Sequence, residues 1–253
     1  MLTLRNIQKS FHLNTPNESN LFSNFHLHVP QHEFVVIVGS NGSGKSTLLN
    51  VIDGNLMVDK GEIFFNEQAI HQQDGYLRCK DISRVYQDPT MGTSPTLTIY
   101  ENMSLALNKG KKFSLKKAVS NENKQEIKKL LSLLELDLEN KLDIKVELLS
   151  GGQRQALSLL MAICARPKLL LLDEHTAALD PKASEHIMKL TNKLVSEFEI
   201  TTIMITHQLK DALSYGDRCI MLHLGKKVLD IKGEEKQNMQ PIQLMSLFHE
   251  LSI

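Results

Sequence analysis

The sequence predicts an α/β fold with a mainly parallel sheet, an antiparallel β subdomain and an inserted α-helical subdomain. Short, continuously apolar runs alternate with helical segments, and such runs suit parallel strands that are buried on both faces. Residues 25–29 alternate apolar and polar side chains, as a half-buried antiparallel strand does. Residues 88–166 carry apolar side chains three and four positions apart, which is the spacing of one helix face.

The individual elements follow from the same patterns. Residues 1–7 are predicted to form an edge strand, and the helix expected at residues 45–53 has a suitable stop in Gly54. A second helix is expected at residues 241–251. Further strands are predicted at residues 34–38, 61–65, 82–87, 169–173, 201–206, 218–222 and 227–231, and an apolar helical stripe at Ile127, Leu130, Leu131, Leu134 and Leu138.

Length and composition indicate one globular domain over residues 1–253. We expect residues 1–87 and 167–253 to form the core with the antiparallel part, and residues 88–166 to form the helical subdomain. The formal net charge of +0 gives no reason to expect a nucleic-acid partner. The three cysteines are odd in number and lack a C-x-x-C pair, which is typical of free thiols in a reducing compartment.

Membrane association would require another polypeptide. No stretch approaches the roughly 20 apolar residues that a membrane-spanning helix needs, so a membrane role would depend on a partner that supplies the span.

A glycine-rich segment between a buried strand and a helix matches the phosphate-loop motif G-x-x-x-x-G-K-[ST]. Its backbone N–H groups and the helix N-terminus are suited to bind phosphates. Lys45 is expected to bridge the β- and γ-phosphates, Ser46 to ligate Mg²⁺ and Thr47 to assist. The motif therefore predicts a phosphate-loop NTPase core, whose nucleotide-binding residues are Gly39, Ser40, Asn41, Gly42, Ser43, Gly44, Lys45, Ser46 and Thr47.

Two carboxylates follow the apolar strand at residues 169–173. Asp173, at the tip of this strand, is placed to hold Mg²⁺ through its water shell. Glu174 comes next and is expected to act as the general base on the attacking water.

The segment Leu149-Ser-Gly-Gly-Gln153 begins a helix and presents a second anion-binding helix start. A chain with one phosphate loop and a second, distant phosphate-binding segment makes sense if two copies meet head to tail. Each copy would then supply Ser150 and Gly152, with Gly151 and Gln153 beside them, to the γ-phosphate bound by its partner.

This order of motifs resembles the nucleotide-binding domain of the ABC family over the whole chain. The resemblance implies binding and hydrolysis of ATP with Mg²⁺. It also implies that Gln87 contacts Mg²⁺ and the attacking water, that His207 holds the γ-phosphate, that Phe11 stacks on adenine, and that the loop ending at Asp180 carries signals across the dimer.

Three short segments resemble those of a bacterial branch of this family that includes tryptophan and tyrosine importers. The segments are residues 91–95, 174–180 and 233–236. His175 stands where many members carry proline, and we interpret it as a tolerated surface substitution. The resemblance implies a separate permease, an extracytoplasmic substrate-binding protein and a place at the cytoplasmic face of the membrane. The alternatives are a soluble ABC ATPase of cofactor assembly and the ATPase of a lipid or export system.

Overall fold

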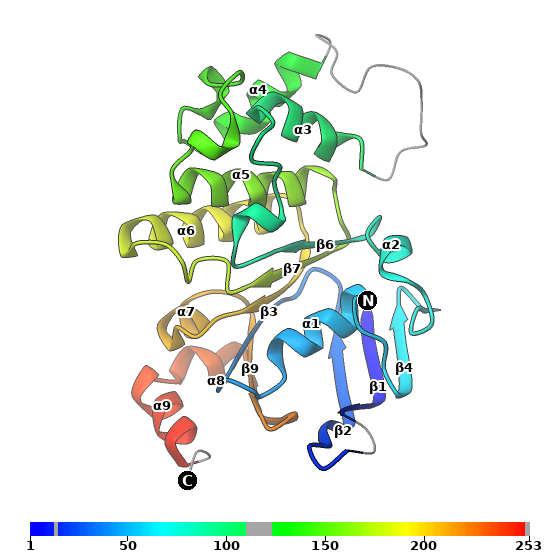
Figure 1. Cartoon of the computed structure of the whole chain (residues 1–253). Helices are drawn as coiled ribbons and strands as arrows, with labels where there is room; N and C mark the ends of the chain where they lie inside the picture. The colour runs from blue at the N-terminus through cyan, green and yellow to red at the C-terminus, as the bar shows by residue number, and fades with distance from the viewer. Residues whose placement is uncertain (13–14, 110–122, 251–253) are drawn as a thin grey trace. The chain divides into compact units, whose positions relative to one another are not determined.

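The computed structural model describes residues 1–12, 15–109 and 123–250, without the side chains of residues 249 and 250 (Figure 1). It divides into two compact units, which are described separately. The first unit consists of Met1–Cys79 and Ile200–Ile253, and the second of Lys80–Glu199.

The antiparallel sheet of the first unit has the strand order β2-β1-β4-β5. Leu2, Leu4 and Ile7 are fully buried on its inner face. Because β1 pairs with both β2 and β4, the prediction of an edge strand is wrong; alternation within a strand does not reveal how many neighbours pair with it. The strands are β1 (Leu2–Phe11), β2 (Ser19–Val29), β4 (Lys60–Phe65) and β5 (Gln68–Ala69).

A second set of strands in the first unit is centred on β3 (Phe34–Gly39), which is buried along its whole length and runs parallel to its two neighbours. The neighbours are β8 (Thr201–Ile205) and β9 (Arg218–His223), and β10 (Lys226–Lys232) pairs with β9 in an antiparallel hairpin. The helices of this unit are α1 (Lys45–Asp53), α2 (Gly75–Arg78), α7 (Leu209–Ser214), α8 (Gly233–Asn238) and α9 (Pro241–Glu250).

The second unit contains the parallel pair β6 (Ile82–Val85) and β7 (Leu169–Asp173) together with the helices that follow each strand in the middle of the chain (Figure 1). The predicted stripe is buried at Ile127, Leu131, Leu134 and Leu138, although the helix itself ends before Leu134. The α-helices are α3 (Ile99–Leu107), α4 (Lys124–Ser132), α5 (Gly151–Cys164) and α6 (Pro181–Glu197), with short 3₁₀ helices at Pro89–Met91, Leu138–Asn140 and Val146–Leu148.

The α/β class predicted from the sequence is confirmed, with parallel strands, an antiparallel sheet and a helical region. Among the described helices, none combines the length and the apolar character that crossing a membrane would require.

Candidate functional site

The phosphate loop, residues 39–47, connects β3 to α1 in the first unit. Gly44 precedes α1 with a φ of 100°, a conformation that glycine adopts without strain. A Cβ atom at this position would lie 3.1 Å from the ring of Phe22, a tight contact that adds to the backbone preference for glycine. Lys45 is only 5% exposed, and its Nζ donates to the carbonyls of Gly39 (2.8 Å) and Ser40 (2.9 Å). The amine is therefore held over the loop.

The phosphate loop packs closely against the end of β9, and the N–H of Gly225 donates to the Ser43 carbonyl at 3.0 Å. The buried hydroxyl of Ser43 has no hydrogen-bond partner among the described residues, although a buried polar atom usually has one. A Cβ on Gly39 would lie 2.4 Å from the Leu222 carbonyl oxygen and would push the loop out of shape. Asn41 and Ser46 are exposed. These features suit a loop that wraps the phosphates of a nucleotide.

His207 follows β8 and belongs to the same unit as the phosphate loop. The backbone N–H of Thr206 donates to the Ile37 carbonyl (3.2 Å), and the Thr206 hydroxyl accepts from the N–H of Gln208 (3.0 Å). The first bond joins the residue before His207 to β3, and the second closes a local turn around His207. The structure thus brings the predicted histidine and the predicted loop to the same end of the parallel strands.

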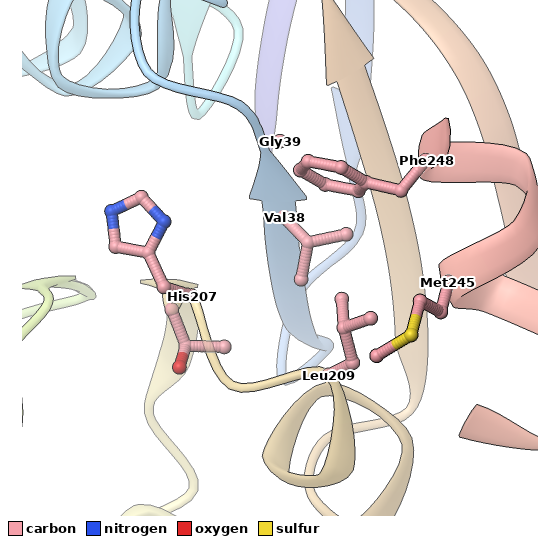
Figure 2. A pocket seen from close by; sticks show the side chains of 7 residues that line it. Val38, Gly39, His207, Leu209, Met245 and Phe248 are labelled. Carbon is pink, nitrogen blue, oxygen red and sulfur yellow. The ribbon is translucent and has the colours of Figure 1, made fainter. Parts of the chain in front are cut away.

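A largely apolar cavity of about 210 Å³ lies between His207 and the first residue of the phosphate loop. Figure 2 shows Phe248 and Met245 projecting from α9 toward Val38 and Leu209. Sequence analysis predicted the C-terminal helix but not its contact with this region. No local signal reports that contact, because an amphipathic helix does not identify the surface on which it packs.

Phe11 is the last residue of β1 and is partly exposed. The Nζ atom of Lys9 lies 5.7 Å from the centre of its ring, within the range of a cation–π contact. An accessible aromatic ring at a strand end is compatible with stacking on a base, and the stacking role stays a prediction.

In the second unit, the register of β6 and β7 places Gln87 and Asp173 at the same edge. Val85 is opposite Leu172, so the residues that follow each strand leave the sheet together. Asp173 accepts a hydrogen bond from Arg84 at 2.5 Å, and the two side chains are only 15% and 8% exposed. Sequence analysis missed Arg84. The sequence does contain a sign of its role, because Arg84 is a basic residue within a predicted strand, and a buried charge requires a partner of opposite charge.

His175 is 2% exposed, so its interpretation as a surface substitution is wrong. Its Nε2 atom lies 3.0 Å from the hydroxyl of Thr191 on α6. Burial lowers the pKa of His175 to about 4, so the ring is neutral at physiological pH. The preceding residue, Glu174, is only partly exposed and has a φ of 48°. Sequence pattern alone could not show that the side chain following it turns inward.

Ser150 caps the N-terminus of α5 as predicted from the motif. Its hydroxyl accepts from the N–H of Gln153 (3.3 Å), and the Gln153 side chain accepts from the N–H of Ser150 (3.2 Å). This reciprocal pair fixes the start of the helix. Asp180 caps α6 in a similar way, accepting from the N–H groups of Lys182 and Ala183.

The two capped helix starts border one open hollow of about 610 Å³. The predicted residues Ser150, Gly151, Gly152, Gln153 and Asp180 all line it. Sequence analysis did not predict the rest of the lining, which consists of Glu135, Leu136, Ala178, Leu179, Lys182, Ala183 and His186.

The segment that carries Gln87 packs on helix α5. The side chain of Gln155 donates to the carbonyl of Tyr86 at 3.2 Å. A Cβ on Gly92 would lie 2.4 Å from the Ser158 hydroxyl oxygen, so the segment approaches the helix closely. Within the second unit, the predicted glutamine is therefore connected to the helix that Ser150 begins.

The predicted residues fall into two sets. Phe11, the phosphate loop and His207 belong to the first unit, whereas Gln87, Asp173, Glu174, Asp180 and residues 150–153 belong to the second. Over the described part of the chain, no three or more His, Cys, Asp and Glu side chains form a metal-binding group.

A family model described as "ABC transporter" matches residues 22–177. This match includes the phosphate loop, the segment at residues 149–153 and the carboxylates that follow β7. The chain belongs to the ABC transporter family, as the order of its motifs predicted.

Among curated relatives, the chain is 50% identical over 248 residues to a tyrosine transport ATP-binding protein of Clostridioides difficile, a match that covers 98% of both chains. It is 32% identical to the thiamine import ATP-binding protein ThiQ of Photobacterium profundum, covering 84% of this chain and 83% of that one.

Solved structures agree with this family. The ATP-binding cassette MJ0796, in a dimeric post-hydrolysis state bound to ADP and Pi, is 30% identical and has a TM-score of 0.78; the match covers 92% of this chain and 98% of that one. The ATP-binding cassette MJ1267, in its ADP conformation, is 27% identical with a TM-score of 0.79; the match covers 100% of this chain and 98% of that one. The chain is an ATP-binding and ATP-hydrolysing subunit of an ABC transporter.

Proposed function

We propose that the chain energises import of an aromatic amino acid of the tyrosine class. It would work at the cytoplasmic face of the membrane with a separate permease and an extracytoplasmic substrate-binding protein. The observation that carries this proposal is the 50% identity to a tyrosine transport ATP-binding protein, which extends over 98% of both chains.

We further propose that two copies bind ATP head to tail. In each, the phosphate loop and Lys45 bind the phosphates, Phe11 stacks on adenine, and His207 holds the γ-phosphate. Ser150 of the partner subunit contacts the same phosphate from the opposite side. The fixed helix start at Ser150 and the dimeric state of the similar cassette MJ0796 support this arrangement.

The residues present suit Mg²⁺ as well. Ser46, Gln87 and Asp173 offer the oxygen ligands that this ion prefers, and when bound it neutralises charge on the phosphates. Arg84 occupies one carboxylate oxygen of Asp173, Oδ2, in the structure. Glu174 takes the proton from the attacking water.

The base assignment is tested with Glu174→Gln, which removes the carboxylate and preserves the shape. We expect hydrolysis to fall at least about 100-fold while ATP traps a stable dimer, as measured by size-exclusion chromatography with light scattering. Glu185→Gln is the matched control, because this exposed residue pairs with Lys189 along the surface of α6. Near-normal hydrolysis by the Glu174 variant would remove it from the base role.

The phosphate-binding role is tested with Lys45→Ala, for which we expect loss of ATP binding in a fluorescent-nucleotide titration. Retained tight binding would contradict the role of the loop.

The transport role is tested by deleting the gene in its native cells and measuring uptake of labelled tyrosine, and by identifying the proteins that co-purify with the wild-type chain. Lost uptake, restored by the wild-type gene, and co-purification with a membrane protein would support import. Recovery only in a water-soluble assembly complex would favour the cofactor-assembly alternative, and accumulation of labelled solute in the deletion strain would favour export.

A further inference from the structure

We propose that His175 is a positioning residue for Glu174, acting through a hydrogen-bonded connection from the loop after β7 to helix α6. The inference rests on the proposed role of Glu174 as general base, and the experiment below separates the two. The connection runs from the His175 ring to the Thr191 hydroxyl and on to the Ile187 carbonyl.

The hydrogen bonds define which nitrogen of the His175 ring acts as a donor. The Thr191 hydroxyl donates to the Ile187 carbonyl at 2.8 Å, which uses its only proton. At the 3.0 Å contact with His175, the threonine oxygen must therefore accept. It follows that Nε2 of the His175 ring carries a proton and donates it to the Thr191 hydroxyl. Both side chains are buried, His175 at 2% exposure and Thr191 at 0%, so water does not compete for this bond.

The position of His175 matters because Glu174 has an unfavourable backbone. A φ of 48° lies in the left-handed region, where residues other than glycine are held only if their surroundings fix them. The Glu174 carbonyl accepts from the N–H of Ala177 (2.9 Å), which closes a tight turn. His175 lies inside that turn and extends into the core, so its ring anchors the turn next to the strained residue.

Packing alone does not explain a histidine here. An apolar residue of similar size would fill the same space, and Thr191 would keep its bond to Ile187. Such a replacement leaves the Thr191 hydroxyl oxygen with one unused acceptor site, and this destabilises the fold less than an unpaired buried donor would. We therefore expect variants without the ring N–H to fold but to hold the Glu174 carboxylate less precisely, which would slow hydrolysis without weakening ATP binding.

The connection can be cut from either end. His175→Leu removes the donor and Thr191→Val removes the acceptor, whereas His175→Gln and Thr191→Ser keep a hydrogen-bonding group at each end. We expect kcat of the two cut variants to fall about 10-fold with KM for ATP within about twofold of wild type. The two conservative variants should recover kcat to within about threefold of wild type. If His175→Leu does not fold, the Thr191 pair tests the same bond.

A second measurement separates positioning from general damage. In the Glu174→Gln background no carboxylate remains to be positioned, so adding His175→Leu should leave the ATP-trapped dimer unchanged. The inference would be overturned if the Glu174→Gln/His175→Leu variant failed to form the ATP-trapped dimer. It would equally be overturned if kcat of His175→Leu and Thr191→Val stayed within about twofold of wild type. If Glu174→Gln alone hydrolyses ATP normally, the base assignment falls and the inference falls with it. If that variant is inactive and the cut variants are normal, only the role of His175 fails.

Discussion

Replacing Arg84 by methionine tests whether the largely buried Asp173 carboxylate depends on the Arg84 cation in the folded second unit. Methionine keeps much of the length of the side chain and removes its charge. The two partners are 2.5 Å apart and 8% and 15% exposed, so Asp173 would lose its cation in a place that water hardly reaches. Removing one partner of a buried ion pair lowers the free energy of unfolding by about 3–5 kcal/mol. Because Asp173 keeps some contact with water, we expect the lower end of this range, about 3 kcal/mol.

For a chain of this size, each kcal/mol lowers the melting temperature by roughly 2–4 °C. The expected decrease for Arg84→Met is therefore about 6–12 °C, measured by circular dichroism at pH 7. Arg84→Lys is the matched control: it keeps the charge but loses the planar guanidinium, so the decrease should be smaller. The double variant Arg84→Met/Asp173→Asn should recover part of the loss, because no charge then remains unpaired. A melting temperature for Arg84→Met within about 2 °C of wild type would refute this reasoning.

Two further predictions concern acid stability and thiol reactivity. Burial raises the pKa of Asp230, but hydrogen bonds from Arg218 and a neighbouring lysine outweigh it and lower the pKa to about 2. Because this pKa is lowered on folding, the ionised Asp230 side chain stabilises the folded state above about pH 4, and this stabilisation is lost as the pH falls toward 2. After allowing for solvent screening, Asp230→Asn should lower the free energy of unfolding by about 1 kcal/mol at pH 7. The difference in melting temperature between this variant and the wild type should therefore shrink in acid. Burial raises the pKa of Cys164 to about 12 and of Cys219 to about 11. At pH 8 the native protein should therefore react with a thiol reagent at the exposed Cys79, and the other two thiols should react only in denaturant.

Local sequence was sufficient where one short segment contains the whole signal. Helix α1 occupies the predicted residues because glycines with left-handed backbones, Gly44 and Gly54, stand at its two ends. The capping box at Ser150 and Gln153 likewise requires residues only three positions apart. The chemical roles of these residues, and the predicted subdomain at residues 88–166, stay predictions.

Three features required the tertiary structure. The pairing of β1 on both sides, the partner of Arg84 and the burial of His175 each depend on residues distant in the sequence, such as Asp173, 89 positions after Arg84.

The sequence by itself determined the class of fold, the order of the motifs and membership of the family, because backbone preferences, glycine turns and apolar spacing act over a few neighbouring residues. Only the tertiary structure decided which polar side chains are buried and which groups they contact. The physical reason is that a buried charge or hydrogen-bonding group is stabilised by whatever partner the fold brings to it, and the sequence around that group does not name the partner.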